Sequence, residues 1–172
     1  MAIYFPNSEI DDLGGEVWRI TSSFTGSQHP MLNWEKSDDV YGSGSGLNIL
    51  SCNNGVFSIN SSQISGNGSW FLLNWHNYAY HNDNSRWIQM ELEVSWNSGA
   101  NYDMHGYATS DLSPNSTSNY NTGGSATGFI LGNSVMRFRW KMNAQNSGVT
   151  TYGYTDATAT GFSIVKIASE NP

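Results

Sequence analysis

A strictly alternating segment, Trp87–Asn97, constrains the fold more than any other part of the chain. From Ile88 onward, apolar and polar residues alternate without a break, which is the period of a β-strand with one buried face. The expected core-facing residues are Ile88, Met90, Leu92, Val94 and Trp96. Burying these side chains contributes about 8–15 kcal/mol gross, at roughly 1.5–3 kcal/mol each. We therefore expect this strand in the middle of a β-sandwich.

Strand patterns recur along the rest of the chain, and no segment has convincing helical periodicity. Asn53-Asn54-Gly55 lies between two apolar runs and predicts a hairpin, because Asn and Gly tolerate a positive φ. The segment 162–168 is apolar on both faces and should lie centrally in its sheet. The expected strands are 16–20, 47–51, 56–59, 70–80, 87–97, 102–109, 135–142, 149–155 and 162–168. About eight to ten short strands predict an all-β fold, an antiparallel β-sandwich of the jelly-roll type.

Two segments lack such patterns. Residues 24–46 are predicted to be irregular and anchored by Met31, Leu32 and Trp34. Residues 110–128 are predicted to form a long loop, because few apolar side chains interrupt their polar and glycine-rich sequence.

The chain divides into an extended N-terminal arm, residues 1–14, and one jelly-roll domain, residues 15–172. The arm carries a short apolar patch, Ile3, Tyr4 and Phe5, that Pro6 ends. It is either a loosely ordered terminus or a clip that docks on a neighbouring subunit or particle. Deletion of residues 2–12 should abolish docking and leave folding intact if the clip interpretation is correct.

Charge excludes some classes of partner. Charged residues make up 12% of the chain, the formal net charge is −7, and the pI is about 4.8. Nucleic acid is excluded as a partner because phosphate binding needs a basic surface, and an anionic membrane is excluded for the same reason. Arg137, Arg139 and Lys141 alternate on one strand and form either a phosphate-binding stripe or an outer face paired with Glu91 and Glu93. We favour the pairing.

The sequence has no P-loop, nucleophile elbow or dinucleotide fingerprint. The single cysteine, Cys52, is predicted to be a small core hydrophobe. His76 and His81 are five residues apart and face opposite sides of a strand, so they cannot easily bind one metal. Asp38-Asp39 and Asn82-Asp83-Asn84 are predicted to form turns rather than calcium sites. We expect no enzyme activity, no cofactor and no metal.

The N-terminus lacks the pattern of a signal peptide, and no apolar run is long enough to span a bilayer. We expect a protein that is made in the cytoplasm and is not exported by a cleavable signal.

Three segments of the second half carry a resemblance to C1q/TNF-like jelly-roll domains. They are Ala-Thr-Gly-Phe-Ile-Leu-Gly-Asn at 126–133, the strand at 135–142, and Thr-Gly-Phe-Ser-Ile-Val-Lys-Ile-Ala at 160–168. The opening Gly-Glu-Val-Trp-Arg-Ile-Thr at 15–21 resembles the start of short structural proteins of tailed phages, notably phages of marine cyanobacteria. Residues 24–46 match neither pattern, and Gly132-Asn133 lacks the acidic residue often found at that turn.

The resemblance implies a homotrimer packed about a threefold axis, with a structural or binding role rather than catalysis. We therefore expect a virion protein that decorates the capsid or another particle surface and contacts other virion proteins. Tyr78 and Tyr80 share one face of their strand, and Tyr152 and Tyr154 share one face of theirs. We predict that some of these tyrosines line the trimer seam, where aromatic residues are enriched. The alternative is that they lie in the ordinary core or on a solvated face.

A second hypothesis is a carbohydrate-binding adhesin or receptor-binding tail protein that recognises a host-surface glycan. Its motivation is aromatic residues next to amides and acids, in Trp75-His76, His81-Asn82-Asp83 and Tyr102-Asp103. Aromatic faces stack on sugar rings, and amides and acids bind their hydroxyl groups.

Overall fold

The structure is a computed structural model that describes residues 15–37, 48–81, 87–111, 120–145, 147–154 and 159–169. The proposed N-terminal clip with Ile3, Tyr4 and Phe5 lies outside the described residues. The strands are β1 (Gly15–Ile20), β2 (Phe24–Thr25), β3 (Trp34–Lys36), β4 (Leu50–Asn53), β5 (Val56–Ile59), β6 (Ser69–His81), β7 (Trp87–Ser95), β8 (Asp103–Asp111), β9 (Tyr120–Gly132), β10 (Arg137–Ala144), β11 (Val149–Thr151) and β12 (Gly161–Ser169). In the described part of the chain, the only helix is the single 3-10 turn at Ser61–Gln63.

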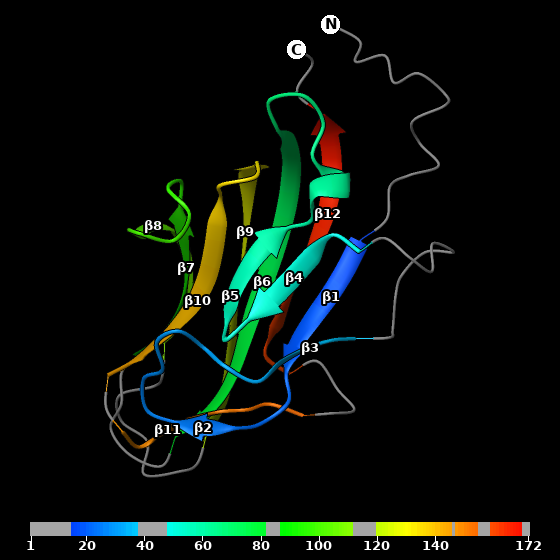
Figure 1. The fold of residues 1–172 in the computed structure, drawn as a ribbon. Helices are drawn as coiled ribbons and strands as arrows, with labels where there is room; N and C mark the ends of the chain where they lie inside the picture. Colours follow the sequence, from blue (N-terminus) through cyan, green and yellow to red (C-terminus); the bar gives the residue numbers. More distant parts are fainter. Residues whose placement is uncertain are drawn as a thin grey trace, which may run out of the picture.

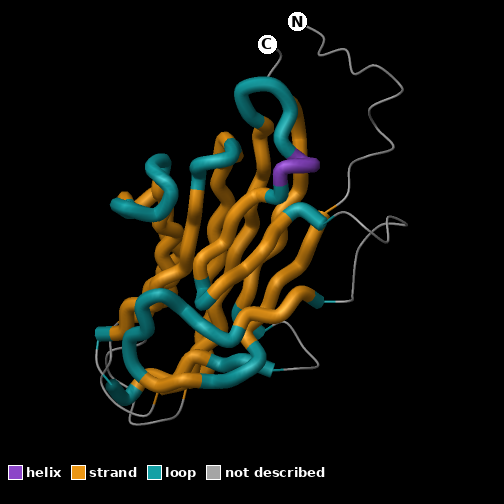
Figure 2. Tube along the Cα trace, in the orientation of Figure 1, coloured by secondary structure: helices purple, strands orange, loops and turns teal. Residues whose placement is uncertain are grey.

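The strands form two antiparallel sheets packed face to face (Figure 1). We name them sheet A, with β3-β1-β12-β6-β9 side by side, and sheet B, with the order β4-β5-β10-β7-β8. The long strand β6 pairs with β9 along its whole length and with β12 and then β11 on its other edge, and β2 pairs with β11. Figure 2 shows that the loops gather mainly at the two ends of this sandwich. The predicted antiparallel jelly roll is confirmed.

β7 behaves as its alternation predicts over most of its length. Ile88, Met90, Leu92 and Val94 are at most 1% exposed and face the space between the sheets. The prediction for Trp96 is wrong, because this side chain is 44% exposed. β7 ends at Ser95, and the chain then turns through Ser98 and Gly99, which both have positive φ.

The outer face of sheet B pairs charges as predicted. Across the β7–β10 register, Arg139 lies opposite Glu93 and Lys141 lies opposite Glu91, with N–O distances of 2.6 and 3.2 Å. His29 also approaches the Glu93 carboxylate, at 2.8 Å. Burial alone would raise the pKa of Glu93, but the hydrogen bonds and charges of Arg139 and His29 outweigh it and lower that pKa.

An aromatic cluster fills the centre of the sandwich. Phe57 stacks on Phe138 at 5.1 Å between ring centroids and meets Phe162 edge-on at 5.1 Å. Phe162 belongs to β12, which lies between β6 and β1, so the predicted central position of this strand is confirmed. The predicted hairpin is also present, with Asn54 at φ 50° and Gly55 at φ 76° between β4 and β5.

The described part of the 24–46 segment is more regular than predicted. β2 pairs with β11 in sheet A, the backbone of Gln28 exchanges hydrogen bonds with Met142 of β10, and β3 then returns to pair with β1. This segment therefore crosses one end of the sandwich between the two sheets. Met31 is fully buried and Trp34 packs against the core, but Leu32 is 39% exposed and does not anchor the segment.

The predicted loop over 110–128 is wrong for residues 110–111, which belong to β8, and for residues 120–128, which belong to β9; residues 112–119 lie outside the described residues. Most inward positions of β9 are small, with Ile130 as the large exception, because β6 presents large side chains to this strand. A Cβ atom at Gly128 would lie 3.2 Å from the Trp75 ring, and one at Gly132 would lie 2.7 Å from the Phe71 ring. A strand that receives its neighbour's aromatic rings has no apolar alternation of its own.

Candidate subunit interface

The outer face of sheet A differs from an ordinary solvated sheet face. Alternation along β6 directs Phe71, Leu73 and Trp75 into the core, where each is at most 2% exposed, and leaves Trp70 and Leu72 on the outer side. Antiparallel sheets with one solvated face usually place polar residues there. At this end of sheet A the outer residues are apolar instead.

We call this surface the apolar band. Five members share one end of the outer face of β6, β9 and β12, and they are Trp70, Leu72, Phe129, Leu131 and Val165. The sixth is Ile167, which lies at the register shift of β12, next to Ala168, the residue opposite Trp70. Phe129 lies opposite Leu72, and Leu131 lies opposite Trp70. Trp70, Phe129 and Ile167 are 38%, 54% and 37% exposed. A contiguous exposed apolar surface of this kind marks an interaction site.

The band continues around the edge of the sandwich. β9 is the edge strand of sheet A, and the neighbouring edge strand of sheet B is β8. The His105 Nε2 atom of β8 lies 2.9 Å from the Phe129 carbonyl oxygen of β9, and the His105 ring meets the Trp96 ring at 6.4 Å between centroids. Trp96 and Met104 are 44% and 59% exposed, so apolar surface extends from sheet A onto this corner.

The four tyrosines predicted for a trimer seam form one cluster at the other end of the same face. The rings of Tyr78 and Tyr152 are 5.5 Å apart, those of Tyr80 and Tyr152 are 6.4 Å apart, and Tyr152 and Tyr154 stack at 5.8 Å between centroids. The Tyr152 N–H donates to the Tyr78 carbonyl, which places the two pairs side by side. Their role in a seam remains a prediction, and replacing Tyr80 or Tyr154 with Glu tests it.

Tyr152 lies next to the other three tyrosines of this cluster, and these neighbours are expected to affect the pKa of its phenol. Partial burial raises the pKa of Tyr152, and the charges of Tyr154, Tyr80 and Tyr78 raise it further. Because the folded state holds the neutral phenol, stability should fall as the pH rises from about 10, the ordinary value, through the raised folded-state pKa. Absorbance titration of the phenolates should lose its highest-pH portion in Tyr152→Phe and retain it in Tyr107→Phe. An unchanged curve for Tyr152→Phe would contradict this assignment.

An open depression of about 490 Å³ borders the tyrosine cluster. It is lined by His76, Asn77, Tyr78, Gly123, Gly124, Ser125, Tyr154 and Ala159. The Asn77 side chain faces inward there and connects three strands. Its Oδ1 accepts hydrogen bonds from Ser110 Oγ at 2.9 Å and Gly124 N at 3.3 Å, and its Nδ2 donates to the Ala108 carbonyl at 3.3 Å. The backbone around the depression is therefore held firmly in place.

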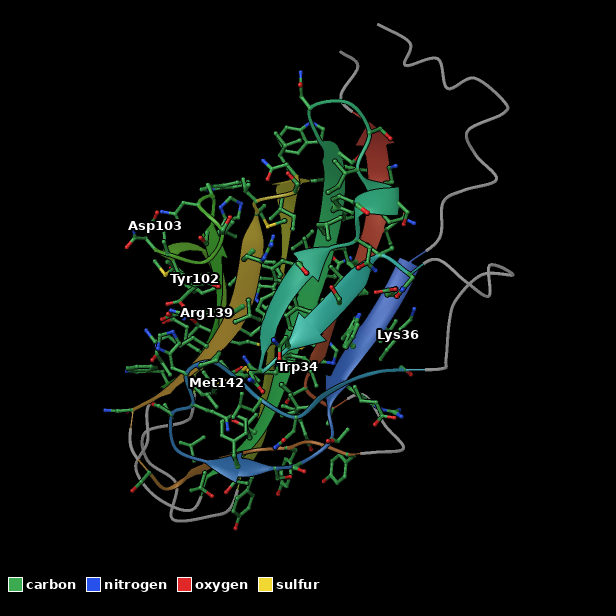
Figure 3. The ribbon with its side chains drawn as sticks, viewed as in Figure 1. Trp34, Lys36, Tyr102, Asp103, Arg139 and Met142 are labelled. Carbon is green, nitrogen blue, oxygen red and sulfur yellow. The ribbon has the colours of Figure 1, made fainter. Side chains whose placement is uncertain are left out.

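Among the described residues, Trp75 and Tyr102 of the carbohydrate hypothesis do not lie in one site. Trp75 is 2% exposed, and its Nε1 donates to the Met90 carbonyl in the core, so its ring cannot stack on a sugar. The Arg139 guanidinium covers one face of the Tyr102 ring at 3.9 Å on the sheet B side (Figure 3). Asn82 and Asp83 lie outside the described residues.

Metal and cysteine chemistry gain no support within the described ranges. No group of three or more His, Cys, Asp or Glu side chains there is placed to hold a metal ion. Cys52 is partly buried against the core, as predicted, and burial raises the pKa of its thiol. No helix in those ranges has the length and apolar character needed to cross a bilayer.

Comparison with known proteins gives matches at the level of structure. No protein-family model matches the sequence, and no curated protein does. The structure is similar to Eiger TNF from S. frugiperda, with a TM-score of 0.63 and 10% identity over 93% of this chain and 96% of that chain. It is also similar to murine APRIL at pH 5.0, with a TM-score of 0.56 and 8% identity over 90% of this chain and 99% of that chain. The chain therefore has a TNF-like jelly-roll fold, which confirms the resemblance to C1q/TNF-like domains at the level of the fold.

Proposed function

We propose that this protein is a structural protein of a phage virion surface, a homotrimer of jelly rolls that decorates the capsid. The observation that carries the proposal is the apolar band on the outer face of sheet A. A monomer would leave Trp70, Phe129 and Ile167 in water, at 38%, 54% and 37% exposure. Covering them with a second copy removes that apolar surface from water.

The arrangement of the band suits a closed ring of subunits. In a cyclic trimer, each subunit presents two different surfaces that fit each other, because the contact is heterologous. The broad apolar face of sheet A is one such surface. The corner formed by β8 and β9, with Trp96 and Met104 exposed, is the other. The trimer implied by the C1q/TNF-like resemblance agrees with this pairing of face and edge.

The virion role is supported by the sequence. The opening at 15–21 resembles short structural proteins of tailed phages, and the chain is poor in charge, with 12% charged residues. The proposed partners are the protein itself and the capsid.

A charge in the middle of the band should dissociate the trimer. Phe129→Glu places a carboxylate on the most exposed member of the band, and desolvating it at a seam is strongly unfavourable. The native mass of the wild-type protein, measured by light scattering after size exclusion, is expected near three times 18.9 kDa. The variant should elute as a folded monomer at the same concentration.

Leu32→Glu is the matched control, since Leu32 is 39% exposed and lies beside the β4–β5 hairpin, at the edge of sheet B opposite β8. It should leave the trimer intact. A wild-type monomer at every concentration, or a trimeric Phe129→Glu variant, would contradict the proposed interface. Binding of wild-type trimer to purified capsids that lack this protein tests the virion role separately, and absence of binding by an intact trimer would argue against decoration.

The second candidate remains a carbohydrate-binding adhesin, and the depression beside the tyrosine cluster favours it. Tyr78 and Tyr154 line an opening of about 490 Å³ with glycine backbone beside them. Aromatic rings next to an accessible backbone can hold a sugar ring. A glycan array that detects binding by wild-type protein but not by Tyr154→Ala would support this candidate, and an array without any binder would count against it.

A further inference from the structure

The first described strand begins in the same row as the apolar band. Gly15 of β1 is registered opposite Val165 of β12. Val165 lies opposite Leu72 of β6, and Leu72 lies opposite Phe129 of β9. Because the neighbouring Glu16 points into the core and is 1% exposed, Gly15 faces the outer side of sheet A, as the band does. The N-terminal arm, residues 1–14, therefore joins the domain beside the apolar band.

Gly15 and the band are in close contact at this junction. A Cβ atom at position 15 would lie 3.0 Å from Val165 Cγ2 and 3.0 Å from the Ile164 carbonyl oxygen. The arm itself lies outside the described residues, and its last residue, Gly14, is also a glycine. Glycine accepts backbone conformations that other residues avoid. The sequence at this junction therefore permits the chain to reverse direction and to pass over the outer face of sheet A.

The apolar band lies well within reach of the arm. Gly15 and Phe129 are three strand spacings apart, which is about 14 Å. The apolar patch of the arm, Ile3, Tyr4 and Phe5, ends ten residues before Gly15. Ten extended residues span up to about 33–36 Å. The patch can therefore reach every member of the band, even along a path that reverses direction beside Gly15.

The patch is a chemical match for this surface. Trp70 and Phe129 are 38% and 54% exposed, and an apolar covering removes their rings from water. A segment of the same chain, attached by a short linker, meets the band at an effective concentration in the mM range. We propose that the apolar patch of the arm docks on the apolar band of its own subunit and leaves it when a second copy takes its place. This inference rests on the proposed function in one respect, because the proposed trimer uses the same band.

Docking of the arm should hold subunits apart. When the band is free in about one subunit in ten, the affinity of one subunit for the next is about tenfold lower. Tyr4→Ser combined with Phe5→Ser removes both aromatic rings of the patch and keeps the length of the arm. This variant should form trimers at a concentration at least about tenfold lower than the wild type does, as measured by sedimentation equilibrium. Asp11→Asn is the matched control, because it alters the arm outside the patch, and it should assemble as the wild type does.

Disulfide cross-linking locates the arm in the free subunit. The variants are made in a Cys52→Ser background, which removes the single native cysteine. Asn7→Cys lies just after the patch, and Thr127→Cys lies at an exposed position of β9, two residues before Phe129. After mild oxidation below the concentration of assembly, this pair should form a disulfide within one chain, visible as a faster-moving monomer on a non-reducing gel. Asn7→Cys paired with Ser58→Cys, on the outer face of sheet B, should not form one.

The outcomes separate the docking of the arm from the formation of the trimer. A disulfide that forms only between two chains, or no disulfide at all, overturns the docking and leaves the proposed trimer intact. Assembly of the Tyr4→Ser/Phe5→Ser variant at the same concentration as the wild type, or at a higher one, also overturns it. If the wild type and the variant are both monomers at every concentration, the proposed trimer fails, and an intrachain disulfide still supports the docking.

Discussion

Glu16→Ala is expected to lower the free energy of unfolding by about 3–5 kcal/mol, the range for breaking a buried ion pair. The Glu16 side chain is fully buried, and its Oε1 accepts from Lys36 Nζ and from the Ile49 backbone N–H, both at 2.7 Å. Its Oε2 accepts from Trp18 Nε1 at 2.9 Å and from the Leu50 backbone N–H at 3.2 Å. The variant leaves all four donors without their acceptor. Because Glu16 belongs to sheet A and Leu50 to sheet B, it also removes a connection between the sheets.

Urea unfolding of the wild-type protein and of Glu16→Ala at neutral pH measures this loss of stability. The dependence of the free energy of unfolding on urea concentration is given one common slope for both proteins. Glu35→Ala is the matched control, because Glu35 lies on the neighbouring strand β3 but is exposed. It should change stability by no more than about 0.5 kcal/mol. Glu16→Gln keeps the shape of the side chain without its charge, and its loss of stability should lie between those of Glu16→Ala and Glu35→Ala. A loss of less than about 1 kcal/mol for Glu16→Ala would show that water replaces the carboxylate readily.

Trp75→Ala is expected to lower the free energy of unfolding by about 3–5 kcal/mol, because it opens a cavity at the centre of the core. Trp75 is 2% exposed and packs against Trp140 with ring centroids 5.2 Å apart. Two glycines leave room for its ring. A Cβ atom at Gly106 of β8 or at Gly128 of β9 would lie 3.2 Å from the Trp75 ring.

A double-mutant cycle tests this fit directly. Gly128→Ala alone should destabilise by about 1–3 kcal/mol through overpacking. In a Trp75→Leu background the added methyl group meets a smaller neighbour, so its cost should fall and the two changes should be coupled by about 0.5–3 kcal/mol. Thr127→Ala, at an exposed position of β9, is the control and should show no coupling. Additive effects of Gly128→Ala and Trp75→Leu would mean that the Trp75 ring is not the reason why position 128 needs a glycine.

Two of the features predicted correctly are ones that neighbouring residues determine. The alternation of β7 and the Asn54-Gly55 turn depend on side chains and backbone preferences within a few positions, and both predictions are confirmed. β9 depends on a distant strand, because its glycines are understood only when the Trp75 and Phe71 rings of β6 lie against them. Trp96 and Leu32 were expected in the core on local pattern alone, and the turn after Ser95 and the path of the 28–31 segment expose them.

The candidate interface also combines features that local sequence determines with features that depend on strand pairing. Alternation placed Tyr78 with Tyr80 and Tyr152 with Tyr154, but the pairing of β11 with β6 was needed to bring the two pairs together. The apolar band has a sequence signal that indicates more than a central strand. Apolar residues on both faces of 162–168 predicted a central strand, and the runs at 70–73 and 129–131 have the same two-faced character. Such runs also indicate a sheet whose outer face is covered by something other than solvent.

The small inward residues of β9 have a consequence for how this protein can change in evolution. β9 is joined to β6 by a ladder along all thirteen residues of β6. Apart from the buried Ile130, its contribution to the core is largely the space that it leaves for the rings of β6. Inward positions such as Gly128 can therefore accept little variation. Outward positions such as Phe129, which is 54% exposed and lies opposite Leu72 on the outer face, can be replaced without altering the core. β9 thus separates, residue by residue, the part of the sequence that maintains architecture from the part that can adapt to a new partner.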